Sequence, residues 1–535
     1  MQAAGDRPHA ALLASPGMGH LIPVLELGKR LVTHHDIHVT IFVVATDAAT
    51  TDSLLKSCPA TITNLSIVPL PAVDVSSHVE PSDHIVTKLL AMMRHSIPNL
   101  RSAISAMPTP PTALVVDIFG TGTFPLADEL GMLKYAFDTT TAWFLATAVY
   151  GSSAEDAVAR HIGSKTPLEV PGCRPVRFDD TLDSYHVIGD RVYHDFQRVG
   201  VEFTTADGIL VNTWEEMEGK TLDALRDRKA MKNMVKAPVY PVGPLVRPSP
   251  PLETTEPNDA VLWLDEQPDR SVIYVSFGSG GTLPLAQLVE LAWGLELSGQ
   301  RFVWVVRPPP VEDDDVSATF FSLGNGSQRG SHHGYLPEGF LSRTRDRGLV
   351  VPMWAPQAEI LAHSAVGGFL SHCGWNSTLE SITNGVPMVA WPLYAEQKLN
   401  AALLTDELQV AVRPESDTAG SMVKREEIEK LVRRVMVAEE EEGKAIRERV
   451  AGLKESGEWA LSRKLKGSSY SALAQVAREL ELNHQRLVAK AQGGGRWDPE
   501  NLRDTYRRAR MWECLPLSFF WSNLVFSLRG REKNI

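Results

Sequence analysis

Short apolar runs alternate with longer amphipathic stretches along this chain, and this alternation most limits how it can fold. Residues 22–35 carry apolar side chains at helical spacing, whereas the apolar runs have the length of buried strands, about four to eight residues. In the first half of the chain the runs span residues 9–15, 38–44, 112–119, 134–138 and 208–213. Strands that alternate with helices pair in parallel, so the sequence predicts an α/β fold.

The same pattern restarts in the second half of the chain. Its apolar runs span residues 271–279, 300–306, 349–354, 367–374 and 387–392. Between the halves lie residues 242–258, rich in Pro, Thr and Glu, which we interpret as a semi-rigid linker. We therefore predict domains at 1–241 and 259–465, a helix at 466–483 and an atypical tail at 484–535. Open parallel sheets bind ligands at the carboxyl ends of their strands, so the site is expected between the domains.

Composition excludes several classes of protein. The chain has 53 Lys and Arg against 65 Asp and Glu, a net charge of −12, so we expect no nucleic-acid partner. Its four cysteines form no CxxC pair, which is typical of a reducing, cytoplasmic location. Without a stretch of about 20 apolar residues, no transmembrane segment is expected. The acidic run at 313–315 lies in a Pro- and Gly-rich loop, where such runs are usually solvated, so no metal site is predicted.

The second domain contains a glycine turn between a strand and a short helix. The strand at 367–374 ends beside His372, and the helix is predicted to begin near Asn376 or Ser377. A helix N-terminus offers free N–H groups and a positive dipole end, which favour an anion. A second donor-rich turn, at residues 276–281, follows another strand of this domain. Together the two turns can hold a diphosphate.

Other polar and aromatic side chains follow neighbouring strands. Glu380, one turn into the helix, is placed to bind a ribose diol, and Trp354 offers a flat face to a base. Glu396 and Gln397 follow the next strand, where they can hydrogen-bond sugar hydroxyls. Each residue alone has an ordinary structural explanation, as a core side chain or a helix cap. Their convergence on the strand ends of one domain favours a nucleotide-sugar site.

These segments together resemble a known family. The stretch from Trp354 to Gln397, with its opening WAPQ, its HCGWNS core and its closing Gln, resembles the signature box of plant family 1 (secondary-product) UDP-glycosyltransferases. The resemblance extends to around residue 480, through SPGMGHLIP, VVDIFG, VNTWEEME, VYPVGPL and VSFGSGG. NGSQ, YLPEGF and YAEQ are most similar to the hydroquinone glucosyltransferase subgroup. The resemblance implies a GT-B fold, in which two Rossmann-like domains face each other across a cleft.

The resemblance also implies a UDP-sugar as co-substrate, with no tightly bound cofactor and no metal. Trp354 would stack on uracil, Ala355 and Gln357 would lie beside the base and ribose, and Glu380 would bind the ribose hydroxyls. The other implied contacts are with the diphosphate, from Ser279, His372, Asn376 and Ser377, and with the sugar, from Trp375, Glu396, Gln397 and Thr141. A closing Gln accompanies glucose donors in this family, so UDP-glucose is the predicted donor. Most relatives carry Asp where Glu396 stands, which keeps the acidic group.

The first domain would supply the catalytic base and the acceptor pocket. His20 stands in a loop after the first strand, where a His can act as a general base near neutral pH. By the resemblance, His20 aligns with the catalytic base of the family and Asp117 with its carboxylate partner. The implied reaction is inverting O-glucosylation of a small phenolic acceptor, such as hydroquinone, a monolignol or a related phenylpropanoid, by a monomer. Aromatic candidates for the acceptor pocket, which are more often core residues, are Phe119, Phe137 and Trp143.

Two other functions compete with this interpretation. SPGMGH could form the phosphate-binding turn of an NAD(P) oxidoreductase, with Asp47 as the ribose acid. However, Pro23 stands where a third Gly is needed, and Asp47 lies well beyond the usual offset of about 20 residues. The second is a non-catalytic nucleotide-sugar-binding protein, which the presence of both His20 and Asp117 disfavours. The tail could also lie in a membrane interface, but we favour a variable extension.

Overall fold

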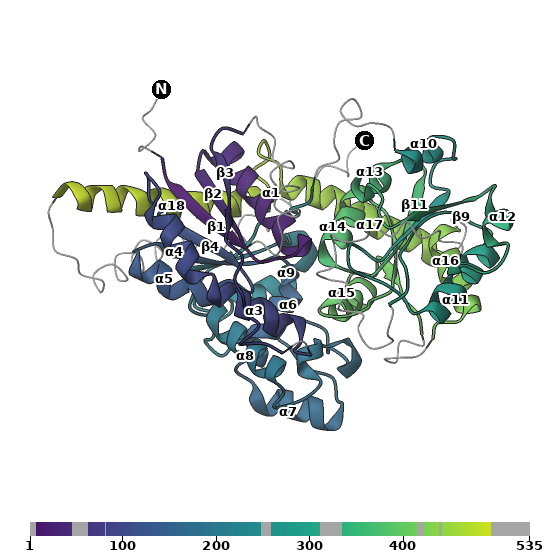
Figure 1. Cartoon of the computed structure of the whole chain (residues 1–535), viewed down its shortest axis with the longest axis horizontal. Coiled ribbons are helices and arrows are strands. Elements are labelled where there is room, and N and C mark those ends of the chain that lie inside the picture. The colour runs from purple at the N-terminus through teal and green to yellow at the C-terminus, as the bar shows by residue number, and fades with distance from the viewer. Residues whose placement is uncertain are drawn as a thin grey trace, which may run out of the picture. The chain divides into compact units, whose positions relative to one another are not determined.

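Two parallel β-sheets, each flanked by helices, organise the computed structural model of the chain (Figure 1). The structure describes residues 7–44, 62–80, 82–247, 258–310, 334–415, 422–437 and 441–493. Most of the predicted linker, the acidic run at 313–315 and most of the predicted tail lie outside the described residues. Residues up to His484 form one unit, which contains both sheets, and the residues after it form a second.

The first sheet belongs to what we term the N-terminal lobe. Its strands are β1 (His9–Ala14), β2 (His38–Val44), β3 (Leu65–Leu70), β4 (Ala113–Asp117), β5 (Leu133–Asp138), β6 (Gly208–Val211) and β7 (Val239–Pro241). They pair in parallel in the order β3-β2-β1-β4-β5-β6-β7. All five predicted runs form strands. The sequence analysis missed β3 and β7, the two edge strands, because β3 is mostly half-exposed and β7 has only three residues.

The second sheet belongs to the C-terminal lobe. Its strands are β8 (Val272–Ser276), β9 (Arg301–Val306), β10 (Gly348–Pro352), β11 (Val366–Ser371), β12 (Met388–Ala390) and β13 (Ala411–Val412). They also pair in parallel, in the order β10-β9-β8-β11-β12-β13. The five predicted runs again form strands, and only the two-residue edge strand β13 was missed. The predicted α/β fold with two parallel sheets is therefore confirmed.

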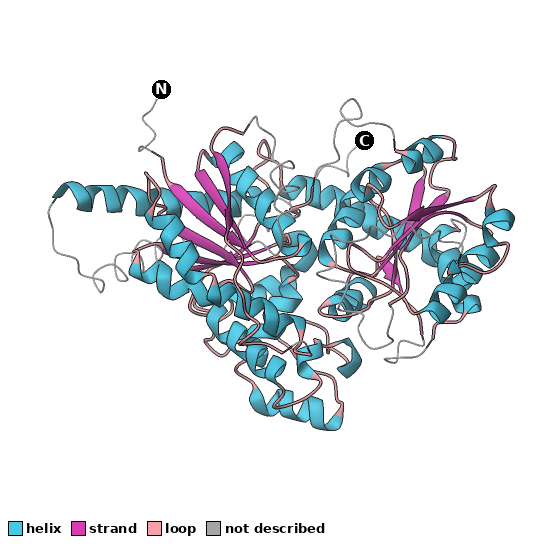
Figure 2. Ribbon diagram, in the orientation of Figure 1, coloured by secondary structure: helices cyan, strands magenta, loops and turns pink. Residues whose placement is uncertain are grey.

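Helices cover both faces of each sheet (Figure 2). In the N-terminal lobe they are α1 (Met18–His35), α3 (Ile85–His95), α4 (Ile97–Ser105), α5 (Phe124–Glu129), α6 (Ala142–Gly151), α7 (Glu155–Ser164), α8 (Arg191–Phe203) and α9 (Glu215–Arg226), with 3₁₀ turns η1 (Thr121–Thr123), η2 (Phe178–Asp180) and η3 (Asp183–Tyr185). After β7 they are α10 (Asp259–Asp265), α11 (Leu285–Ser298), α12 (Phe340–Thr344), α13 (Gln357–Ala362), α14 (Trp375–Asn384), α15 (Gln397–Ala402), the π-helical segment η6 (Leu403–Glu407), α16 (Arg425–Met436), α17 (Glu441–Ala460) and α18 (Ser468–Gly493).

Helix α18 returns to the first lobe and completes its core. Its Val476 and Leu480 are buried in the same apolar cluster as Leu12 of β1. Its Glu479 accepts hydrogen bonds from the hydroxyl groups of Tyr135, at 2.5 Å, and Tyr240, at 2.7 Å. The helix runs to Gly493, beyond the predicted end at residue 483. The chain therefore crosses between the lobes twice, and its C-terminal helix is part of the N-terminal core.

Polar contacts also join the two lobes. Asp180 in η2 is buried and accepts two hydrogen bonds from Arg413, at 2.9 and 3.2 Å. Glu407, at the end of the π-helical segment, pairs with Arg174 at 2.7 Å and with Lys220 at 2.8 Å. The Asp180–Arg413 pair is well shielded from water, so it is screened by salt less than the exposed pairs. These contacts fix the spacing of the lobes around the space between them.

Replacing Leu480 by Ala tests whether α18 belongs to the N-terminal core. Leu480 is fully buried, so truncating it should cost about 2–5 kcal/mol of stability and lower the thermal midpoint clearly. Leu482, two residues away on the same helix and 49% exposed, is the matched control, and Leu482→Ala should change the midpoint little. Equal midpoints for the two variants in differential scanning fluorimetry would contradict this packing.

Candidate active site

A cavity of about 460 Å³ lies at the carboxyl ends of both sheets. Segments that follow β1, β4 and β5 line it from one lobe, and segments that follow β8, β10, β11 and β12 line it from the other. The predicted site residues along its wall are His20, Phe119, Ser279, Trp354, Ala355, Gln357, His372, Trp375, Asn376, Ser377, Glu380, Glu396 and Gln397. The structure thus brings together residues that are far apart in the sequence, as expected for parallel strands that end on one edge.

His20 and Asp117 form a pair on the N-terminal side of the cavity. The Nδ1 atom of His20 lies 3.4 Å from Oδ2 of Asp117. Asp117 is wholly buried at the end of β4, and it accepts hydrogen bonds from Ser15 N at 2.8 Å, Ser15 Oγ at 2.5 Å and Phe119 N at 3.2 Å. These donors fix the carboxylate, which faces Nδ1 and leaves Nε2 on the opposite side of the imidazole ring. The arrangement suits a general base with an orienting carboxylate.

On the opposite wall, His372 stands at the start of the α14 turn. Two glycines make room for its ring, because a Cβ atom at Gly278 or at Gly374 would come within 2.5 Å of it. Burial lowers the pKa of His372 to about 4, so the ring is neutral near pH 7. Its Nδ1 is buried and has no hydrogen-bond partner among the described residues. A neutral imidazole beside a helix N-terminus offers one more N–H donor to an anion.

Helices α13 and α14 are joined by a side-chain amide. Gln357 donates from Nε2 to Ser377 Oγ at 2.9 Å and to Glu380 Oε2 at 2.7 Å. Burial raises the pKa of Glu380, and the hydrogen bond from Gln357 opposes that rise. The other oxygen of Glu380 and the hydroxyl hydrogen of Ser377 are left for a ligand.

Trp354 lies at the edge of the cavity with an exposed indole. Its exposed fraction, 64%, is the largest among the large apolar side chains of the described residues. Met353 before it has a φ of 64°, and Trp354 N donates to Pro352 O at 2.7 Å, so a tight turn presents the ring. Ala355 is buried beside it, and Ser279 is exposed on the turn after β8. An exposed ring on a cavity wall suits base stacking.

Two side chains of α14 contact the other lobe. Trp375 is buried and donates from Nε1 to Asn212 O at 2.8 Å. Asn376 donates from Nδ2 to Gly19 O at 3.2 Å. The indole N–H of Trp375, a residue expected to contact the sugar, is therefore engaged across the lobes. The Nδ2 of Asn376, predicted to contact the diphosphate, is likewise engaged across the lobes.

Glu396 and Gln397 stand where α15 begins. Gln397 is buried, and its Oε1 accepts from Leu393 N at 2.9 Å and from Tyr394 N at 3.2 Å, which fixes the loop. The Gln397 side chain also hydrogen-bonds the Tyr394 side chain. Burial raises the pKa of Tyr394, and this hydrogen bond opposes the rise. Burial raises the pKa of Glu396, while the nearby His20 lowers it. The acidic group predicted to bind the sugar is therefore close enough to His20 for their charges to interact.

Besides Asp117, which is buried behind His20, three predicted residues do not line this cavity. Thr141 is buried and caps α6, where its Oγ1 accepts from Phe144 N at 2.9 Å, and Thr139 and Thr140 line the wall instead. Phe137 is wholly buried in the N-terminal core, and Trp143 lies in a separate pocket beside Arg174 and Asp180. The cavity is lined by the next residue, Phe144. Successive helical residues point about 100° apart, so a one-residue error changes the face.

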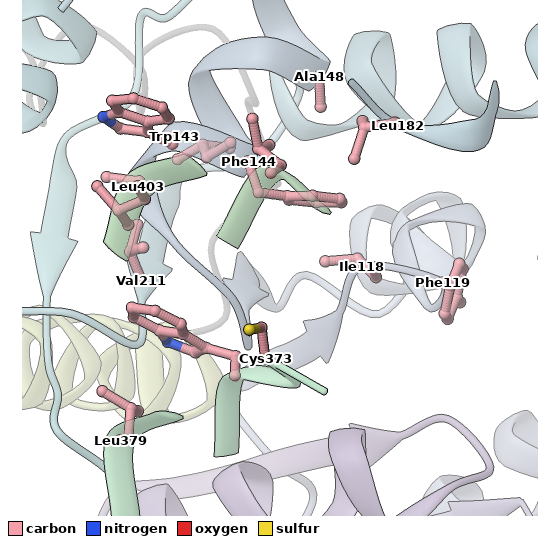
Figure 3. Close-up of a cluster of buried hydrophobic side chains, with 14 of the residues drawn as sticks. Ile118, Phe119, Trp143, Phe144, Ala148, Leu182, Val211, Cys373, Leu379 and Leu403 are labelled. Carbon is pink, nitrogen blue, oxygen red and sulfur yellow. The ribbon is translucent and has the colours of Figure 1, made fainter. Parts of the chain in front are cut away.

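The sequence analysis also missed part of the site. The apolar wall residues that it did not single out are Ile85, Leu89, Ile118, Phe144, Leu182 and Phe196, several of which are drawn in Figure 3. They come from separate helices and turns, and no motif joins them. Asp138, at the end of β5, does not line the cavity, but it accepts hydrogen bonds from N and Oγ1 of the wall residue Thr140, at 2.9 and 2.7 Å. Like Asp117, it could have been found as a polar residue at the end of a predicted strand. Burial raises its pKa to about 7.

Comparison with known proteins agrees with this geometry. Residues 248–418 match the model of a family described as UDP-glucoronosyl and UDP-glucosyl transferase. UDP-glycosyltransferase 72E2 of Arabidopsis thaliana is 51% identical over 488 residues, which cover 91% of this chain and 99% of that protein. The chain belongs to the plant family 1 UDP-glycosyltransferases. Hydroquinone glucosyltransferase of Rauvolfia serpentina is 42% identical over 476 residues, 88% of this chain and 97% of that one.

A solved structure supports the fold of this glycosyltransferase. TcCGT1 in complex with UDP has a TM-score of 0.82 and 45% identity, and the match covers 89% of this chain and all of that one. The chain has the GT-B fold and is an enzyme that uses a UDP-sugar as co-substrate. Its described residues contain no cluster of three or more His, Cys, Asp or Glu side chains that could hold a metal ion. Within the same residues, none of the helices is long and apolar enough to cross a membrane.

Replacing Gly278 by Ala tests whether the position of His372 matters for nucleotide binding. The added Cβ would come within 2.5 Å of His372 Cε1 and force the ring to move, so the Kd for UDP should rise about tenfold or more, equivalent to about 1.4 kcal/mol. Gly299→Ala is the control: its φ of 68° is close to the 75° of Gly278, but nothing lies within 4 Å of its Cβ. Isothermal titration calorimetry measures both, and equal Kd values would contradict the role of His372.

Proposed function

We propose that this enzyme transfers glucose from UDP-glucose to the hydroxyl group of small phenols, with inversion at the anomeric carbon. The observation that carries the proposal is the position of His20. It lies in a cavity whose opposite wall holds the N-terminus of α14 and the neutral His372. A base on one side and anion-binding groups on the other are what displacement of UDP by an acceptor hydroxyl requires.

The proposed reaction is a single displacement. His20 Nε2 takes the proton of the acceptor hydroxyl, and the buried Asp117 stabilises the imidazolium that forms. The acceptor oxygen bonds to the anomeric carbon as the bond to the UDP oxygen breaks, through an oxocarbenium-like transition state. Attack from the face opposite UDP converts the α-linked donor into a β-glucoside. Phenols suit a His base because their pKa, about 10 as for Tyr, lies below that of alcohols.

Neutral donors would stabilise the leaving group without a metal. The N–H groups at the start of α14 and the N–H of His372 would face the diphosphate as its charge increases. Glu396 and Gln397 would bind the sugar hydroxyls, and Gln397 supports glucose as the donor sugar. Hydroquinone glucosyltransferase, the relative described above, carries glucose in its name, which supports the same choice.

The acceptor side of the cavity is largely apolar. Leu89, Phe119, Phe144 and Phe196 line it, and the Phe119 ring lies 5.0 Å from the His20 ring, centre to centre. An apolar wall with aromatic rings beside the base favours flat, aromatic acceptors. The name of the hydroquinone glucosyltransferase relative also points to phenols. We therefore propose small phenols of the hydroquinone or phenylpropanoid type as acceptors.

We also propose that the enzyme acts as a cytoplasmic monomer. Both walls of the cavity come from one chain, so a single copy has a complete site. The four cysteines of the sequence form no CxxC pair, which is usual in a reducing compartment.

A His20→Ala variant tests the proposed base. With UDP-glucose and hydroquinone, kcat should fall by about 10²–10⁴-fold, because general-base catalysis is lost, while the Kd for UDP stays the same. The chain provides a matched control in a second His–Asp pair outside the cavity, His363 and Asp265, whose Nε2 and Oδ1 are 3.1 Å apart. The variant His363→Ala should keep full activity.

The measurement is acceptor-dependent UDP release, combined with NMR of the product. A β-glucoside and the loss of turnover in His20→Ala are expected. Full turnover in His20→Ala, or an α-glucoside, would overturn the mechanism. Binding of UDP-glucose without turnover of any phenol would instead indicate an acceptor outside the phenols.

A further inference from the structure

A carboxylate of the N-terminal lobe holds a loop of the C-terminal lobe. The loop, residues 391–396, joins β12 to α15. Its Ala395 donates from N to Oδ2 of Asp183 at 2.9 Å. Nζ of Lys398, in the first turn of α15, lies 3.9 Å from Oδ1 of the same carboxylate. Both oxygens of Asp183 therefore lie against the loop and the helix that follows it.

Asp183 is itself fixed in the core of its own lobe. It begins the 3₁₀ turn η3, whose last residue, Tyr185, is wholly buried. The Tyr185 ring packs edge-to-face on Phe196 of α8, with ring centres 5.8 Å apart, and its hydroxyl donates to Thr147 O at 3.3 Å. The carboxylate that accepts from the loop is thus carried by a rigid turn.

The backbone conformation of the loop requires support from outside. Ala395 has a φ of 58°, in the left-handed region that residues other than Gly rarely adopt. Such a conformation persists only where the surrounding structure holds it. Gln397 holds the loop from within, since its Oε1 accepts from Leu393 N and Tyr394 N. The hydrogen bond from Ala395 to Asp183 adds an anchor in the other lobe.

The anchored residue directly precedes two predicted sugar ligands, Glu396 and Gln397. Ala395, Glu396 and Gln397 all line the cavity, and so does Asp183. Burial raises the pKa of Glu396, and the nearby negative charge of Asp183 raises it further. Because Oδ2 of Asp183 accepts from Ala395 N and Oδ1 lies towards Lys398, Asp183 acts on a bound sugar through the loop and not by direct contact.

We propose that Asp183 is a positioning residue for the donor sugar: from the N-terminal lobe it holds the loop that presents Glu396 and Gln397, and so orients the glucose of UDP-glucose for attack. The inference rests on the proposed function, because it takes Glu396 and Gln397 as the residues that bind the glucose hydroxyls. UDP without a sugar does not reach these two residues, so its binding does not depend on Asp183.

The Asp183→Ala variant removes the acceptor of the Ala395 N–H and tests this role. The Kd for UDP-glucose should rise about tenfold or more, the size of one lost hydrogen bond to a charged group, whereas the Kd for UDP should change by less than about twofold. Isothermal titration calorimetry without an acceptor measures both. A general loss of structure would weaken both ligands alike, so the ratio of the two Kd values separates positioning from stability.

The Asp183→Asn variant separates the hydrogen bond from the charge. The Asn side-chain oxygen can still accept from Ala395 N, while the negative charge near Glu396 is lost. Losing that charge lowers the pKa of Glu396 and favours its carboxylate form, which accepts hydrogen bonds from sugar hydroxyls. The contact with Lys398, at 3.9 Å, is too long for a hydrogen bond, so its loss should matter little. Asp183→Asn should therefore recover most of the affinity for UDP-glucose that Asp183→Ala loses.

Asp207→Ala is the matched control. Asp207 is a half-buried carboxylate of the same lobe that also accepts from a backbone N–H at 2.9 Å, that of Lys134. It precedes β6, and Lys134 lies at the start of β5, so the pair is at the edge of the sheet opposite to the cavity. Asp207→Ala should keep the ratio of the two Kd values found for the unaltered enzyme.

Failure of this inference and failure of the proposed function give different results. If the unaltered enzyme glucosylates a phenol but Asp183→Ala leaves both Kd values unchanged, or raises them by the same factor, Asp183 does not position the sugar and the proposed function stands. An Asp183→Asn variant as weak for UDP-glucose as Asp183→Ala would also overturn the inference. If the unaltered enzyme does not bind UDP-glucose, the proposed donor is wrong, and the inference is overturned with it.

Discussion

The contact between the start of α14 and the N-terminal lobe is the interaction on which the site depends. Trp375 donates to Asn212 O, and Asn376 donates to Gly19 O, the residue before His20. The helix whose N-terminus faces the cavity is thus fixed against the loop that carries the base. This contact sets the spacing of base and anion site, which otherwise belong to separate lobes. A small shift of α14 relative to this loop would lower the reaction rate, because reacting atoms must lie about 3–3.5 Å apart.

The electrostatics of the site are local rather than global. The chain carries a net charge of −12, which repels an anionic co-substrate at long range. The anion side of the cavity nevertheless offers donors that need no positive charge: backbone N–H groups and a His372 whose burial lowers its pKa to about 4. Preorganised dipoles in a cavity with little water are strong donors. Burial raises the pKa values of the Glu380 and Glu396 carboxyl groups. Glu380 is held by a hydrogen bond from Gln357, and Glu396 is close enough to His20 for their charges to interact.

Sequence reasoning was reliable where backbone rules apply and weaker where packing decides. Buried strands and their carboxyl ends follow from local patterns, so the two sheets and the cavity position of residues such as His372 were predictable. The path of the Trp375 indole across the lobes was not, because it depends on a contact with Asn212, far away in the sequence. The choice of Trp143 rather than Phe144 for the cavity wall was also wrong. Neighbouring residues of a helix point in different directions, and only the packing of the helix shows which one faces the cavity. The acceptor wall, drawn from several helices, has no local pattern at all.

The central claim is that one cavity aligns an acceptor hydroxyl between His20 and the anomeric carbon of UDP-glucose. A crystal structure of the enzyme with UDP-2-fluoro-glucose, which reacts poorly, and 4-propylphenol tests it most directly. The account predicts that the phenol oxygen lies within hydrogen-bond distance of His20 Nε2, on the face of the anomeric carbon opposite the diphosphate. A phenol bound away from His20, or on the same face as the diphosphate, would contradict it.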